Sequence, residues 1–145
     1  MLKSIMFDYS GTVLVTNESA RGGGFEGGFK AVCRHIGLAE PKATDFVEFA
    51  LRTEWELQGI RNKTTFEIRF QQILAIVVDY FGVEKVNLAA LEEIFYTAAF
   101  SYCPAPGIEP FLQFVRDAGV KTAIISNSTN SGALINREIE RCGLR

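Results

Sequence analysis

The stretch Ile5-Met6-Phe7-Asp8-Tyr9-Ser10-Gly11-Thr12-Val13 decides how the rest of this sequence is interpreted. In it, a short apolar run ends at the carboxylate of Asp8, and a polar turn that contains Gly11 follows. The run over residues 3–8 does not alternate between apolar and polar side chains, which favours a central parallel strand buried on both faces. Open α/β sheets bind ligands at the carboxyl ends of their strands, so this pattern puts Asp8 where a nucleophile can act.

A second strand of the same buried kind is predicted over residues 120–126, near the other end of the chain. A helix over residues 108–118 precedes it and stops at Gly119, and another helix is expected from Asn130 to about Cys142. A strand followed by an insert, a helix, a second strand and a helix is the beginning of an interrupted α/β sheet.

Between the two strands, apolar side chains recur at helical spacing, and no strand is expected from residue 29 to residue 102. We expect one helix over residues 29–36, a second from Asp45 to about residue 59, a third from Thr64 or Thr65 to residue 81, and a fourth over residues 88–100. Four amphipathic helices with short links predict a small bundle. We assign Phe46, Trp55, Phe66 and Phe70 to its core.

The predicted fold is therefore α/β, with a parallel-sheet core interrupted by an all-helical bundle. The sheet part takes residues 1–16 and 104–145, and the bundle takes residues 17–103. The segment 13–28 contains five glycines (Gly22, Gly23, Gly24, Gly27 and Gly28). Glycine loses much conformational freedom on ordering, so we interpret this segment as a mobile hinge between the two parts.

Length and composition describe an ordinary globular protein. The chain has 145 residues, of which 48% are hydrophobic, and a net charge of -2, which argues against a nucleic-acid partner. The apolar stretch 73–78 is much shorter than the roughly 20 residues of a membrane span. The three cysteines Cys33, Cys103 and Cys142 have no metal-type spacing, so we expect reduced thiols in a cytoplasmic protein.

The motif Asp8-Tyr9-Ser10-Gly11-Thr12-Val13 resembles the first motif of the haloacid dehalogenase-like hydrolases. The resemblance implies a Rossmann-like core with a helical cap, and it makes Asp8 the nucleophile of an aspartyl-phosphate mechanism. It also implies Mg²⁺ held by Asp8 and the Ser10 carbonyl, and a sharp turn at Gly11 and Thr12 that directs N–H groups at phosphate oxygens. The structural alternative is an aspartate that only caps its own turn.

Ser126 and Asn127 end the second predicted strand and resemble the second motif of the same family. There the resemblance gives Ser126 a hydrogen bond to a phosphoryl oxygen and lets Asn127 orient neighbouring groups. A Ser-Asn-Ser turn after a strand is also ordinary loop chemistry, so the assignment depends on its pairing with Asp8.

Ser10 departs from the family pattern, because most of its phosphatases have a second aspartate there as a general acid. A hydroxyl is a poor acid. In the family a non-acidic residue at this position occurs in dehalogenases, phosphonate hydrolases and ion-pumping ATPases. Dehalogenases usually have an aromatic residue there, and phosphonate cleavage needs a cap lysine that none of Lys30, Lys42, Lys63 and Lys85 matches by context. A phosphatase acting on a small phosphorylated metabolite is the leading expectation.

The family continues beyond its second motif with a lysine and an acidic pair, which this sequence lacks before its end at Arg145. We therefore expect a fragment whose own hydrolysis is feeble or absent. Its open sheet edge would be covered by a missing C-terminal segment or by a second copy in a homodimer. The alternative from another class is a non-catalytic binding protein on the same scaffold.

Several other residues are assigned no role in catalysis. The only histidine, His35, is expected to be solvated in the last turn of a helix, where the dipole favours a cation. The cluster Gly22-Gly23-Gly24 is not a phosphate loop, since no Lys-Ser/Thr pair follows it. Four basic residues of the insert could face substrate from the cap, yet surface charge is their default, namely Arg21, Arg52, Arg61 and Lys63.

Overall fold

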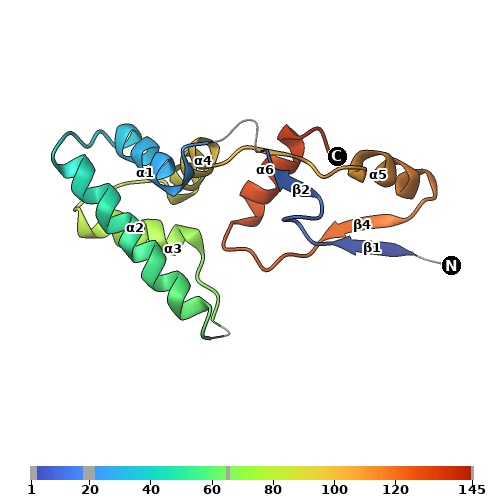
Figure 1. Ribbon diagram of the computed structural model, residues 1–145, viewed down its shortest axis with the longest axis horizontal. Coiled ribbons are helices and arrows are strands. Elements are labelled where there is room, and N and C mark those ends of the chain that lie inside the picture. The colour runs from blue at the N-terminus through green and yellow to red at the C-terminus, as the bar shows by residue number, and fades with distance from the viewer. Residues whose placement is uncertain (1–2, 18–21, 65, 145) are drawn as a thin grey trace.

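The computed structural model describes residues 3–17, 22–64 and 66–144. In these ranges the fold is mixed α/β and rich in helix. The strands are β1 (Ser4–Phe7), β2 (Leu14–Thr16), β3 (Tyr102–Pro104) and β4 (Lys121–Ile124), and the helices are α1 (Gly24–His35), α2 (Lys42–Arg61), α3 (Phe70–Tyr80), α4 (Leu88–Ala99), α5 (Ile108–Asp117) and α6 (Gly132–Arg141). Helices α1–α4 gather at one end, the strands and α5 lie at the other, and α6 lies between them (Figure 1).

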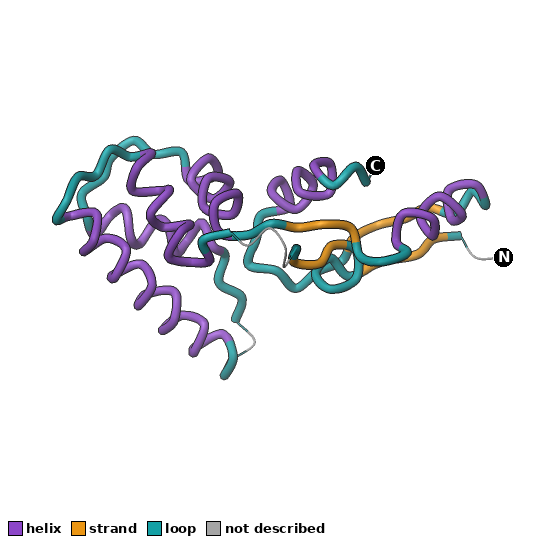
Figure 2. Tube along the Cα trace, turned by 45° about the horizontal axis from the view of Figure 1, so that its top comes forward, coloured by secondary structure: helices purple, strands orange, loops and turns teal. Residues whose placement is uncertain are grey.

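Strands β1 and β4 pair in parallel, as the sequence predicts. Their register runs from Ser4 opposite Lys121 to Phe7 opposite Ile124. Strands β2 and β3 form a separate antiparallel pair beside the link to the bundle, which Figure 2 shows as a narrow connection. The parallel pairing brings the chain that follows β1 next to the chain that follows β4.

The expectation that both faces of these strands are buried is wrong. Every residue of β4 is exposed, and in β1 only Phe7 is buried. The reason is that the apolar cluster of this part, to which Phe7, Val13, Ile108 and Leu144 belong, includes side chains of β1 but none of β4. Beside it, Met6 and Ile125 remain 65% and 64% exposed.

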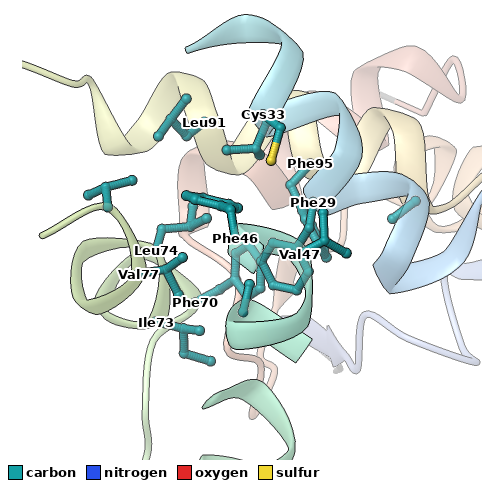
Figure 3. Packing of buried hydrophobic residues seen from close by; sticks show 14 of the residues in the cluster. Phe29, Cys33, Phe46, Val47, Phe70, Ile73, Leu74, Val77, Leu91 and Phe95 are labelled. Atoms are coloured by element: carbon teal, nitrogen blue, oxygen red, sulfur yellow. The ribbon is translucent and has the colours of Figure 1, made fainter. Parts of the chain in front are cut away.

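The helical bundle is confirmed, and its core is aromatic. Phe29, Phe70 and Phe95 are buried at the centre, with ring centroids 4.3–6.2 Å apart. Figure 3 shows these rings meeting side chains from the neighbouring helices. Leu134 of α6 belongs to the same cluster, so the last helix packs on the bundle as well as on the sheet part.

Helices α1, α2, α3 and α6 begin at other residues than expected. Helix α1 begins at Gly24 instead of residue 29, and α6 begins at Gly132 instead of Asn130. Helix α2 begins at Lys42, before Asp45, and α3 begins at Phe70, where Gln72 accepts a hydrogen bond from the N–H of Arg69 and forms a cap. Thr64 does not cap α3, because its hydroxyl donates to the carbonyl oxygen of Ile60 and closes the end of α2. Thr65 lies outside the described residues.

Part of the glycine-rich segment has regular structure. Strand β2 and the first turns of α1 lie in it, residues 18–21 lie outside the described part, and its role as a hinge stays a prediction. At Gly28 packing accounts for the glycine, because a Cβ there would lie 2.6 Å from the ring of Phe95. Glycine here lets α1 and α4 approach closely.

Strand β3 was also not expected, since three residues are too few for a recognisable pattern.

Two residues assigned to the bundle core are on the surface. Trp55 is 79% exposed and Phe66 is 68% exposed, whereas Phe46 and Phe70 are buried as expected. Trp55 lies on the outer face of α2, and Phe66 precedes α3, so neither shares the helical stripe that faces the core.

The described residues include no helix that is long and apolar enough to cross a membrane. Cys33, Cys103 and Cys142 are free thiols, and burial raises the pKa of Cys33 to about 11.

Candidate active site

The candidate site is built where β1 and β4 end. The N–H of Ile125 donates to the carbonyl oxygen of Phe7 at 2.9 Å, which extends the parallel pairing by one residue. Asp8 and Ser126 are the next residues on the two strands. Both residues therefore lie at the carboxyl end of the parallel pair, and both line one pocket of about 820 Å³.

The carboxylate of Asp8 is exposed and held by its own turn. The N–H of Tyr9 donates to Oδ1 of Asp8 at 2.7 Å, which sets the direction of the carboxylate. The turn then closes through a hydrogen bond from Leu14 N–H to the carbonyl oxygen of Tyr9 at 3.1 Å. Ser10 is exposed beside Asp8 and lines the same pocket.

Gly11 and Thr12 shape this turn from outside the pocket lining. Gly11 has a φ of 77°, a left-handed conformation that favours glycine, which agrees with the sharp turn expected there. Its N–H donates to the carbonyl oxygen of Leu14 at 2.8 Å. That N–H is therefore engaged within the turn, and the expected contact of Gly11 and Thr12 with phosphate oxygens stays a prediction.

The second side of the pocket is the β4–α6 loop, residues 125–131. Ser126 and Asn127 are exposed on it, and the loop residues up to Asn130 line the pocket. The N–H of Asn130 donates to Oγ of Ser128 at 3.1 Å. The loop thus presents hydroxyl and amide groups toward the same space as Asp8.

Arg61, at the end of α2, also lines the pocket, although surface charge was its default assignment. Its Nη2 donates to the carbonyl oxygen of Asn127 at 3.1 Å, and its Nε lies 2.8 Å from Oε1 of Glu67. Because 66 residues separate Arg61 from Asn127, no local pattern could have found this contact. Arg52 and Lys63 are exposed as expected, and Arg21 lies outside the described residues.

The remaining wall is aromatic and comes largely from the bundle. Phe25 of α1, Tyr96 of α4, Phe100 after α4 and Tyr102 of β3 line it together with Tyr9. Burial raises the pKa of Tyr9, Tyr96 and Tyr102, so these phenols are neutral at physiological pH. The hydroxyl of Tyr9 is buried without a hydrogen-bond partner in the described part of the chain. The pocket therefore combines one polar side with one apolar aromatic side.

The donors at the site suit one mode of Mg²⁺ binding. No group of three His, Cys, Asp or Glu side chains able to hold a metal occurs in the described ranges, so a cage built from protein side chains is not offered there. Mg²⁺ in proteins is also held by one or two carboxylates together with substrate phosphate and water. The Asp8 carboxylate on the pocket lining is a ligand of that kind, and Mg²⁺ held by Asp8 and the Ser10 carbonyl stays a prediction.

His35 is the last residue of α1 and is exposed, as the sequence predicts. It is not among the residues that line the pocket. The described site therefore has no imidazole, and Asp8 is the carboxylate on its lining.

No family model and no curated protein matches the chain. Among solved structures, the chain is similar to one described as "Crystal Structure analysis of a Dehalogenase", with 18% sequence identity and a TM-score of 0.40. The alignment covers 96% of this chain and 56% of that chain. This chain thus spans little more than half the length of the dehalogenase.

Proposed function

We propose that the chain carries the nucleophile side of a Mg²⁺-dependent hydrolase of the haloacid dehalogenase type, with a small phosphorylated metabolite as substrate. The observation that carries the proposal is the adjacency of Asp8 and Ser126 at the carboxyl ends of two parallel strands, in one pocket with Arg61. In this proposal residues 1–16 and 104–145 form the catalytic core, and residues 17–103 form a cap over it.

The charges and donors of the pocket suit a phosphate ester. The guanidinium of Arg61 supplies positive charge, and the hydroxyl of Ser126 can donate to a phosphoryl oxygen. Arg61 already forms an ion pair with Glu67, which weakens its attraction for a phosphate dianion. Ser126 therefore takes the direct contact with substrate in this proposal.

The reaction proceeds by covalent catalysis at Asp8. One carboxylate oxygen attacks phosphorus, an oxygen–phosphorus bond forms, and the bond to the leaving alkoxide breaks. The Tyr9 N–H, which donates to Oδ1 at 2.7 Å, keeps the carboxylate oriented for this attack. Ser10 is a poor acid, so the leaving group takes its proton from solvent, and water then hydrolyses the acyl phosphate. Bound Mg²⁺ would neutralise phosphoryl charge beside Asp8 and the Ser10 carbonyl.

The aromatic wall sets the kind of metabolite in this proposal. Phe25, Tyr96 and Phe100 come from the bundle and offer apolar surface opposite the polar loop. A substrate whose phosphate meets Asp8 can place an apolar group against these rings, and burying it contributes about 25 cal/mol per Å². The bundle would then select the substrate and exclude water from the nucleophile.

Hydrolysis of an aryl phosphate tests the proposal. Mg²⁺-dependent turnover that Asp8→Asn abolishes, and that Asp79→Asn leaves unchanged, is the expected result. Asp79 is a suitable control because it is exposed on α3 and does not line the pocket. Slower amide hydrogen exchange around Asp8 in the presence of beryllium fluoride would identify Asp8 as the phosphate acceptor. Turnover that survives Asp8→Asn would overturn the mechanism.

One observation favours a second candidate, a non-catalytic binding protein. The pocket has a serine at the position of the general acid, and the residues described around it contain no metal cluster. A protein that binds orthophosphate or a phosphorylated metabolite in the pocket, yet shows no turnover with Mg²⁺ present, would be of this class.

A further inference from the structure

Glu92 is an unusual residue, because it is a carboxylate in the interior of the protein. It lies on α4, is 1% exposed, and is packed beside the aromatic core of the bundle. A buried carboxylate is costly unless other groups satisfy it. Three hydrogen bonds do so here: Gln71 Nε2 donates at 2.7 Å, Ser131 N–H at 2.9 Å and Ser131 Oγ at 2.6 Å.

Two of these bonds come from the β4–α6 loop. Ser131 is the last residue of that loop and caps α6, since its hydroxyl also accepts from Leu134 N–H at 3.2 Å. Glu92 thus reaches from the bundle to the first residues of α6, where the helix dipole favours a negative charge. The contact joins a bundle helix to the loop on which Ser126 and Asn127 lie.

The loop has further attachments, and they also come from the bundle. Phe70 N–H donates to the carbonyl oxygen of Thr129 at 2.9 Å, and Arg61 donates to the carbonyl oxygen of Asn127 at 3.1 Å. The Arg61 contact is solvent-exposed, whereas Glu92 is a buried residue and its bonds to Ser131 are partly buried. Charge-assisted hydrogen bonds in such surroundings are the stronger kind, so Glu92 is the firmest of these attachments.

We propose that Glu92 is a positioning residue, which holds the β4–α6 loop in the shape that lines the Asp8 pocket. Ser126 is fixed on one side by the parallel pairing of β4 with β1, through the bond between Ile125 and Phe7. On its other side the loop is fixed by Glu92 through Ser131. The bundle is then part of the support of the site as well as its cover. The consequence for catalysis rests on the proposed function, but the structural part does not.

Amide hydrogen exchange at Phe70 gives a direct measure of loop attachment. Phe70 is the first residue of α3, so its N–H has no partner within the helix, and its bond to Thr129 is its protection. Glu92→Gln should speed exchange at Phe70 about tenfold. The substitution removes the charge from the bonds to Ser131, and it places an amide NH₂ opposite groups that are themselves hydrogen-bond donors. Amides in the middle of α3, such as that of Leu74, should keep their rates.

Glu93→Gln is the matched control. Glu93 is the next residue on α4 and forms ion pairs with Arg137 and Arg141 of α6, and it does not contact the loop. Its loss should leave exchange at Phe70 unchanged. Equal exchange at Phe70 in Glu92→Gln and the wild type would overturn the proposal, and so would equal acceleration by the two variants. If Glu92→Gln does not fold, Ser131→Ala decides. It removes the Oγ bond to Glu92 and should accelerate exchange at Phe70 as well as at Leu134, whose N–H loses its cap, while Leu74 keeps its rate.

Kinetics separate positioning from general stability. In the active enzyme, Glu92→Gln should raise KM for an aryl phosphate about tenfold with little change in kcat, because the loop that carries Ser126 binds substrate less firmly. A fall in kcat with unchanged KM would contradict the assignment of Glu92 to the loop. Turnover that survives Asp8→Asn would overturn the proposed function and leave this inference intact. Where the wild-type chain shows no turnover, the exchange experiment decides this inference by itself.

Discussion

The hydrogen bond from Ile125 N–H to the carbonyl oxygen of Phe7, 2.9 Å long, determines the geometry of the candidate site. Each of these two residues is followed directly by a candidate site residue, Asp8 after Phe7 and Ser126 after Ile125. A shift of one residue in strand register would turn every side chain of β4 to the other face. The proposed chemistry therefore depends on strand pairing as much as on the identity of Asp8.

Ser126→Ala tests the proposed contact with substrate. A hydrogen bond to a charged phosphoryl group is worth about 1.5–3 kcal/mol, so kcat/KM for an aryl phosphate should fall roughly 10- to 100-fold. Steady-state kinetics check this. Ser4→Ala, at an exposed position of β1 away from the pocket, should leave kcat/KM unchanged. A loss of less than twofold in Ser126→Ala would remove Ser126 from the site.

Ser10→Asp tests the absence of a general acid. An aspartate at this position could protonate a poor leaving group, and general acid catalysis contributes about 10²-fold or more. Hydrolysis of an alkyl phosphate should therefore accelerate, whereas a nitrophenyl ester, whose leaving group needs no proton, should change little. Equal effects on the two esters would show that proton donation is not what limits the wild-type protein.

Gly28→Ala and Gly59→Ala form a pair that tests the packing account of the glycine-rich segment. A Cβ at Gly28 would lie 2.6 Å from the Phe95 ring, whereas a Cβ at Gly59 in α2 meets nothing within 4 Å. Overpacking should cost about 1–3 kcal/mol at Gly28. At Gly59, alanine should add about 0.5–1 kcal/mol through helix propensity. Urea unfolding measures both, and equal effects would support the hinge interpretation instead.

Phe95→Ala tests the centre of the bundle. Phe95 is fully buried and its ring meets those of Phe29 and Phe70, so the free energy of unfolding should fall by about 3–5 kcal/mol. Trp55→Ala is the contrasting variant, because Trp55 is 79% exposed and its loss should change stability by no more than about 0.5 kcal/mol. A large loss in Trp55→Ala would mean that its side chain is covered in solution.

Cys33 predicts how stability depends on alkaline pH. Burial raises the pKa of its thiol from 9.0 to about 11 in the folded state. Between these values the unfolded chain has released the proton and the folded chain keeps it, so the unfolded state binds fewer protons and stability falls as pH rises. Chemical denaturation from pH 8 to pH 10 should show this fall. It should be shallower in Cys33→Ala, and an unchanged slope would contradict the shifted pKa.

Much of the fold was predictable because its signals are local. The predicted start of the fourth helix at residue 88 matches α4, which Asn87 caps because its side chain accepts from the N–H groups of Ala89 and Ala90. The parallel strands were recognisable from two apolar runs that end in polar turns. The start of α3 was misplaced because the caps compete locally: Thr64 bonds back to Ile60, and Gln72 caps through Arg69.

The candidate site was predictable in part for the same reason. Asp8 and Ser126 belong to short motifs of consecutive residues, which can be recognised in the sequence. Arg61 and Glu92 belong to no such motif, because their partners Asn127 and Ser131 are 66 and 39 residues away. Nothing within a few residues of Arg61 or Glu92 distinguishes them from other charged residues on helices.

The sequence by itself determined the order of the helices and of β1 and β4, the parallel pairing of those two strands, and the identity of the carboxylate at the end of β1. Spacing of apolar side chains and capping groups carries that information within a few residues. Only the tertiary structure decided that the outer sheet face is exposed, that glycine lets α1 meet Phe95, and that Glu92 holds the β4–α6 loop. These features depend on which surfaces meet across the fold, and packing between distant segments leaves no periodic trace in the sequence.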